Sequence, residues 1–209
     1  MIKVLIADDH PIVRQGLKQI VTKTFDMVVG GEAHNGQEVL DKVLTEDFDV
    51  IVLDITMPDR SGLDALRTLR CERPTLPVLM LSMHPEGQYA VRVLKAGAAG
   101  YMTKESAPAE LVKAIRKVCD GGKYVSSSMA EQLASALGGR DNPPHNTLSD
   151  REYQVMCLIV KGFTVTEIAE QLKLSVKTIS TYRTRVLKKL NLKNNIELTH
   201  YAIRNRLVD

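Results

Sequence analysis

Short apolar runs of strand length recur along the first half of the chain at intervals of roughly 25 residues, and a segment with helical apolar spacing follows each of them. This alternation is typical of consecutive strand-helix units, which build a parallel sheet. The expected strands are residues 3–7, 27–33, 50–53, 78–81 and 100–102. The expected helices are residues 11–22, 35–46, 62–71, 86–96 and 107–120.

Three of the strand runs, VLIA, VIVL and VLML, are apolar at every position. A strand needs this composition when helices cover both faces of its sheet. The first part of the chain is therefore predicted to be an α/β domain, with five parallel strands in a doubly wound, flavodoxin-like sheet.

The pattern changes after residue 122. A short helix is expected over residues 127–137, and RDNPPHN at 140–146, with two prolines and no apolar residue, indicates a linker. Beyond it the pattern is helical only, over residues 150–160, 165–172, 176–190 and 195–206, with Ser149 or Asp150 expected to cap the first helix. The predicted parts are residues 1–122, a linker at 123–146, and a small all-α domain at 147–209.

Composition places the chain among globular proteins. Its 209 residues are 44% hydrophobic and 25% charged, which suits one or two domains with a buried core. The N-terminal MIKVLIADDH is apolar over only a strand's length, so we expect neither signal peptide nor membrane anchor, and a cytoplasmic location. The cysteines Cys71, Cys119 and Cys157 lie far apart in helical stretches, which favours reduced, partly buried thiols.

The formal net charge of +3 is unevenly distributed. Residues 1–122 hold 15 Lys and Arg against 17 Asp and Glu, whereas residues 147–209 hold 11 against 6. A basic C-terminal part attached to a nearly neutral one is typical of a nucleic-acid-binding module, although a solvated basic surface has the same sum.

Polar residues gather at the predicted carboxyl ends of the strands, where open parallel sheets bind ligands. They are Asp8 and Asp9 after the first strand, Asp54 after the third, Ser82 after the fourth and Lys104 just past the fifth. If the first and third strands are neighbours, three carboxylates converge and repel one another unless a cation neutralises them. Mg²⁺ is the expected cation, because it prefers carboxylate, carbonyl, water and phosphate oxygens.

Each residue also has an ordinary structural interpretation. Asp8 or Asp9 would serve equally as a cap for the next helix. Asp54 would be a loop acid, and Lys104 a solvated charge. One acid at a strand end is weak evidence, but the five positions together make a complete phosphoryl-transfer site, and this joint pattern favours that chemistry.

The motifs KVLIADDHP, VIVLDITMP, LMLSMH and GAAGYMTK resemble the receiver domains of two-component response regulators over nearly all of the first domain. The resemblance implies that Asp54 is the phosphoacceptor. It implies that Asp8, Asp9 and Asp54 hold Mg²⁺ together with the backbone carbonyl of Thr56. It also implies that Lys104 contacts the phosphoryl group.

The same resemblance implies a switch, with Ser82 as the hydroxyl that hydrogen-bonds the phosphoryl group and Tyr101 as the aromatic side chain that turns toward the core. Asp54 would then attack the phosphorus of a phosphohistidine, and no enzyme activity is expected beyond self-phosphorylation and autodephosphorylation. The chain departs from many receivers at Glu105, where proline would follow the lysine. A cis Lys104–Glu105 peptide is therefore disfavoured.

The C-terminal part has the pattern of a helix-turn-helix, with a short turn at Leu174 and Ser175 between two helices. No acidic residue stands between Glu170 and Glu197. The cations expected on the exposed side of the second helix are Lys177, Arg183, Arg185, Lys188 and Lys189. Such a one-sign surface suits phosphate contacts, although a soluble basic face or a protein-binding surface would have the same charges.

The preceding helix and turn favour DNA binding, and the segment from LSDRE onward resembles the LuxR/FixJ-type effector domain. Over its full length the chain resembles the NarL/FixJ family, and GAAGYMTK and KTISTYRTRVLKKL are similar to its GacA/UvrY-type members. The resemblance implies base contacts from Lys177, Ser180, Thr181 and Thr184. It implies contacts on or near the DNA backbone from Thr178, Arg183, Arg185 and Lys188.

The implied function is that of a phosphorylation-controlled transcription regulator. The expected partners are a sensor histidine kinase, promoter DNA and, after phosphorylation, a second copy of the chain, with RNA polymerase as a further candidate. One alternative is a haloacid-dehalogenase-like phosphatase, which needs a second acid two residues after its nucleophile, where this chain has Thr56. The other is a DNA-binding protein with a decayed receiver, against which all five site positions are filled.

Overall fold

The structure is a computed structural model that describes residues 1–83, 92–126, 130, 144–172, 174–205 and 207. The chain forms two compact units, Met1–Gln132 and Leu133–Asp209, called here the N-terminal and C-terminal units. The helix expected at 127–137 lies outside the described residues. So does the beginning of the helix expected at 86–96, of which residues 92–95 are helical.

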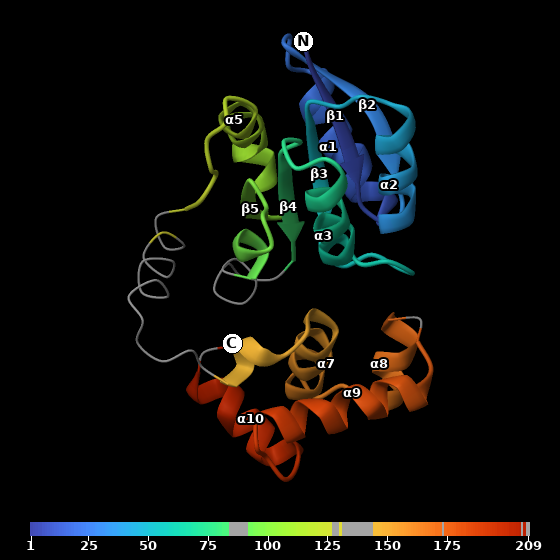
Figure 1. Cartoon of the computed structure of the whole chain (residues 1–209), viewed down its shortest axis with the longest axis vertical. Coiled ribbons are helices and arrows are strands. Elements are labelled where there is room, and N and C mark those ends of the chain that lie inside the picture. The colour runs from blue at the N-terminus through green and yellow to red at the C-terminus, as the bar shows by residue number, and fades with distance from the viewer. Residues whose placement is uncertain (84–91, 127–129, 131–143, 173, 206, 208–209) are drawn as a thin grey trace. The chain divides into compact units, whose positions relative to one another are not determined.

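The N-terminal unit contains a sheet of five parallel strands in the order β2-β1-β3-β4-β5 (Figure 1). Its strands are β1 (Ile2–Ala7), β2 (Met27–Ala33), β3 (Val50–Asp54), β4 (Val78–Ser82) and β5 (Gly100–Thr103). The predicted flavodoxin-like sheet is confirmed. The last three strands each extend one residue further than expected, because Asp54 pairs with Leu81 and Ser82 with Thr103 in the parallel ladders.

Helices pack against this sheet as α1 (Pro11–Thr22), α2 (Gly36–Thr45), α3 (Gly62–Glu72) and α5 (Ala107–Cys119). Helix α1 packs beside α5, and α2 packs beside α3. The central strands β1, β3 and β4 are buried almost throughout, as their all-apolar sequences predict. Of the cysteines, Cys157 is buried and Cys119 half-buried, but Cys71 is exposed, so partial burial was wrong for this residue.

Gly62 begins α3 where the main chain returns to the end of β3. Its N–H donates to the carbonyl of Ile55 at 3.0 Å. A Cβ at this position would overlap the backbone carbonyl of Asp54. The close approach of α3 to the end of β3 therefore requires glycine.

The folded N-terminal unit includes residues that the sequence pattern assigns to the linker. Tyr124 is buried, its N–H donates to the carbonyl of Ala99 at 2.9 Å, and the N–H of Tyr101 lies 3.3 Å from the Tyr124 carbonyl. This pairing extends the sheet beside β5.

The C-terminal unit also includes residues that the sequence pattern assigns to the linker. A 3-10 turn at Pro144–Thr147 is attached to the rest of this unit by His145, whose ring contacts the Tyr201 hydroxyl at 3.0 Å.

The C-terminal unit is helical, with α7 (Asp150–Val160), α8 (Val165–Leu172), α9 (Val176–Lys189) and α10 (Asn195–Arg204). Ser149 caps α7 in a capping box with Glu152. Helices α7 and α8 both pack on α9, and α10 packs on α7. The predicted all-α domain is confirmed. No helix in the described part of the chain has the length and apolar composition needed to cross a membrane.

Candidate functional site

Three carboxylates meet at the carboxyl edge of the sheet. Strands β1 and β3 are neighbours, with Ala7 opposite Leu53, so the residues that follow them lie side by side. Ligand atoms of Asp8, Asp9, His10 and Asp54 all lie within 4.8 Å of one another. The carboxylates therefore converge, as the sequence predicts for neighbouring first and third strands.

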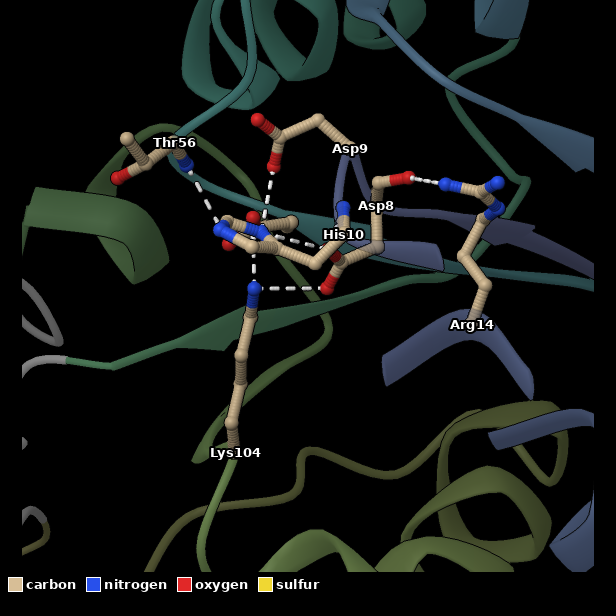
Figure 2. A network of polar contacts seen from close by, with 7 residues as sticks. Asp8, Asp9, His10, Arg14, Thr56 and Lys104 are labelled. Carbon is tan, nitrogen blue, oxygen red and sulfur yellow. Dashed lines mark hydrogen bonds and ion pairs between the residues drawn. The ribbon is translucent and has the colours of Figure 1, made fainter. Parts of the chain in front are cut away.

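Lys104 reaches into this cluster from the end of β5 (Figure 2). Its Nζ lies 2.7 Å from Asp8 Oδ2 and 2.8 Å from Asp54 Oδ2, and its side chain is only 6% exposed. Its main-chain N–H donates to the carbonyl of Ser82 at 2.8 Å, which places the lysine at the sheet edge. The loop after β5 thus delivers one buried cation to two buried carboxylates.

The carboxyl of Asp54 has a perturbed pKa. Burial raises the pKa of its carboxyl to about 6, against the opposing effect of Lys104 and with a further increase from Asp8. Burial disfavours the charged form of Lys104, but Asp54 and Asp8 outweigh it and hold the lysine pKa above its ordinary value. At neutral pH Asp54 is therefore a largely ionised, poorly solvated carboxylate beside a cation.

This pKa shift predicts a pH-dependent stability of the metal-free protein. Below about pH 4 the Asp54 carboxyl is neutral in both the folded and the unfolded state. Between about pH 4 and about pH 6 the unfolded chain ionises first, so the free energy of unfolding falls as the pH rises, by roughly 3 kcal/mol in total. Urea unfolding with a chelator at about pH 4 and about pH 8 measures this change. An Asp54→Asn protein with the same pH dependence as wild type would contradict it.

The donor set fits a hard divalent cation. Asp8 Oδ2 and Asp9 Oδ1 are buried, and they face Lys104 Nζ at 2.7 Å and His10 Nδ1 at 2.8 Å. Three convergent carboxylates supply the oxygen ligands that Mg²⁺ prefers, and the cation would neutralise their mutual repulsion. Thr56 is placed beside the cluster, because its N–H lies 3.3 Å from Asp54 Oδ1. A role for its carbonyl stays a prediction.

The structure adds two residues that the sequence argument missed. The N–H of His10 donates to Asp8 Oδ1 at 2.8 Å, and its ring nitrogen lies 2.8 Å from Asp9 Oδ1. Arg14 donates to the backbone carbonyl of Asp8 at 2.7 Å. His10 could have been found from the sequence, because it directly follows the acidic pair Asp8 and Asp9. A cation in the first turns of the following helix is a weaker signal, because such residues are usually solvated.

The two switch candidates are both buried. Ser82 ends β4 and is 1% exposed, one strand away from Asp54. Tyr101 on β5 is fully buried, so its ring already lies inside the unit. Lys104–Glu105 is a trans peptide, since the described residues contain no cis peptide bond.

Helix α9 carries most of the predicted DNA-contacting residues on its open side. The exposed members of the set are Lys177, Ser180, Thr181, Thr184, Arg185 and Lys188. Thr178 is half-buried, and its hydroxyl lies 2.7 Å from that of Ser175, the residue that caps the helix. The side chain of Thr178 is therefore partly used inside the unit.

Two of the expected cations have partners within the unit. Lys189 is exposed, as expected, but its Nζ lies 2.6 Å from the buried carboxylate of Glu152 on α7. Arg183 is half-buried, and its Nε donates to Asn195 Oδ1 at 2.7 Å. Both positions fall near the side of α9 that packs on its neighbours, and sequence spacing alone does not show where these long side chains turn.

Each of the two units matches a known protein family. Residues 4–116 match the model for the response regulator receiver domain, and residues 146–202 match that for bacterial regulatory proteins of the luxR family. The response regulator UvrY of Escherichia coli (strain K12) is 41% identical over 99% of this chain and 96% of its own. The response regulator GacA of Pseudomonas syringae pv. syringae (strain B728a) is 40% identical over 100% and 99%.

Solved structures of RcsB are similar to the whole chain. RcsB from Salmonella enterica serovar Typhimurium, bound to promoter rprA with the phosphomimetic BeF3-, has a TM-score of 0.66 and 30% identity, and covers 96% of this chain and 97% of its own. A structure of two RcsB dimers bound to two parallel DNAs has a TM-score of 0.60 and 29% identity, covering 100% and 99%. The chain therefore belongs to the response regulators, with a receiver domain followed by a luxR-family DNA-binding domain.

Proposed function

We propose that Asp54 accepts a phosphoryl group from a phosphohistidine of a sensor kinase, and that this modification promotes binding of the C-terminal unit to promoter DNA. The observation that carries the proposal is the pairing of the buried Asp54 carboxylate with Lys104 at 2.8 Å, inside a cluster of three acids. A structural ion pair needs one acid and one base. The two additional acids leave an excess of negative charge at the site, which favours the entry of a cation and, with it, a phosphoryl group.

The reaction follows from the positions of the side chains. An Asp54 carboxylate oxygen forms a bond to phosphorus while the bond from phosphorus to the imidazole nitrogen breaks, and the imidazole leaves with that electron pair. Lys104 stays beside Asp54 and pairs with an oxygen of the transferred group. When bound by Asp8, Asp9, Asp54 and the Thr56 carbonyl, Mg²⁺ supplies the charge neutralisation that three carboxylates and a phosphoryl group require. Autodephosphorylation is the hydrolysis of the phosphorylated Asp54 by water at the same site.

Output depends on DNA and on a second copy of the chain. RcsB structures contain promoter DNA and dimers, and the exposed polar and basic side chains of α9 are available for the same use here. We infer that two phosphorylated protomers bind an inverted repeat with half-site centres about one helical turn apart. RNA polymerase is a further candidate partner. The proposed location is the cytoplasm, where the protein would encounter both the kinase and the promoter.

Ser82→Ala tests the link between modification and output. The variant is expected to accept phosphate from acetyl phosphate and Mg²⁺ as wild type does, but its affinity for promoter DNA should rise far less after phosphorylation, because the methyl group cannot donate to the phosphoryl oxygen. Phosphorylated protein is quantified by mass, and DNA affinity is measured before and after. Ser82→Thr keeps the hydroxyl and should respond like wild type. A full DNA-binding response from Ser82→Ala would refute the switch role.

A further inference from the structure

Arg14 is a buried cation that the proposed reaction does not use. It lies on α1 and is 8% exposed. One guanidinium nitrogen donates to the Asp8 carbonyl at 2.7 Å, and Nε lies 3.6 Å from Glu32 Oε2 on β2. Glu32 in turn accepts from Lys18 Nζ at 2.6 Å. Arg14 is thus held between strand β2 and the loop that carries the acidic pair.

Two cations hold Asp8 from different sides. Figure 2 shows Lys104 directed at the carboxylate of Asp8 and Arg14 directed at its main chain. Asp8 lies just beyond the end of β1, and its N–H donates to the carbonyl of Ala33 at 3.2 Å. Its carbonyl accepts a hydrogen bond from the Arg14 side chain and not from a neighbouring strand, because β1 has ended. A guanidinium carries its donors in a fixed plane, so this contact also sets the direction of the carbonyl.

We propose that Arg14 is a positioning residue for the divalent cation. By holding the Asp8 carbonyl, it fixes how the chain leaves β1 and hence where the carboxylates of Asp8 and Asp9 lie. Arg14 touches neither the metal nor the phosphoryl group. The proposal rests on the Mg²⁺ site of the proposed function and assigns the preorganisation of that site to one side chain on α1.

A positioning role and simple electrostatics predict opposite changes in Mg²⁺ affinity when Arg14 is replaced. Removing a positive charge near a cation site lowers the repulsion on Mg²⁺, so electrostatics alone predicts tighter binding. Loss of a group that orients metal ligands weakens binding, typically by roughly 10- to 100-fold. Lys18 provides the matched control, because it belongs to the same network but contacts Glu32 and not Asp8.

The experiment compares wild type, Arg14→Met, Arg14→Lys and Lys18→Met as full-length, metal-free chains. Mg²⁺ affinity is measured by calorimetric titration, and folding is checked by thermal unfolding with a chelator. Arg14→Met is expected to bind Mg²⁺ roughly 10- to 100-fold more weakly. Phosphorylation of this variant by acetyl phosphate should recover to nearly the wild-type rate at saturating Mg²⁺. Arg14→Lys should be intermediate, because an ammonium keeps the charge and a donor but lacks the fork.

Lys18→Met should bind Mg²⁺ as tightly as wild type or more tightly. Equal or tighter binding by Arg14→Met would overturn the proposal, as would equal weakening in Arg14→Met and Lys18→Met. If Arg14→Met does not fold, the comparison of Arg14→Lys with Lys18→Met decides in the same way. Failure of the wild-type chain to bind Mg²⁺ at all would instead overturn the proposed metal site itself.

Discussion

Replacing Asp54 with Asn is expected to abolish incorporation of a phosphoryl group from acetyl phosphate or a cognate kinase. The amide oxygen is a weak nucleophile and carries no charge, whereas the buried carboxylate has both the charge and the position beside Lys104. Wild type should gain one phosphoryl group per chain, measured by intact mass, and removal of Mg²⁺ with a chelator should prevent it.

Asp59→Asn is the matched control for this substitution. Asp59 lies in the loop between β3 and α3, is exposed, and has a positive φ that asparagine also tolerates. This variant should be phosphorylated like wild type. Undiminished labelling of the Asp54→Asn protein would place the acceptor elsewhere. Multiple-turnover hydrolysis of a small phosphoester by wild type would instead favour the phosphatase alternative.

Removing exposed cations of α9 is expected to weaken binding to every DNA sequence. Arg185→Ala and Lys188→Ala should each lower the slope of log affinity against log salt by roughly one unit, because each removes a phosphate contact and its counterion release. Arg183→Ala carries the same prediction with a smaller expected effect, since Arg183 is held by Asn195. DNA binding by phosphorylated protein over a range of salt concentrations measures the slope. Lys161→Ala, an exposed cation after α7, is the control and should leave it unchanged.

Ser180→Ala and Thr184→Ala are expected to leave the salt slope unchanged and to alter preference at particular base pairs, by roughly 1–3 kcal/mol each. The Thr184 hydroxyl donates to the carbonyl of Ser180 at 2.9 Å, so its lone pairs are what it offers to a base. Selection of bound DNA from a random pool tests this. Equal loss of affinity on all sequences would refute α9 as the base-reading helix, and protection of a single half-site would refute the paired arrangement.

Much of the fold follows from local patterns in the sequence. The all-apolar runs around Val52 and Leu79 identify strands buried on both faces, and Ser149 with Glu152 identifies the start of α7. Strand and helix boundaries agree to within one or two residues where both are described, because caps and breaks are set by nearby residues. The site residues at strand ends were predictable for the same reason. In a parallel sheet the carboxyl ends share one edge, so position in the sequence determines position in the site.

Tertiary structure decided what depends on contacts between distant segments. Lys189 and Arg183 are paired with Glu152 and Asn195, partners 37 and 12 residues away. Tyr124 joins the sheet because β5 has a free edge and Gly100 leaves room for it. Arg14 reaches the Asp8 carbonyl only once α1 lies against the sheet. Helical spacing gives the direction of a Cβ atom, but the end of a long charged side chain goes to whichever buried partner the packed fold offers.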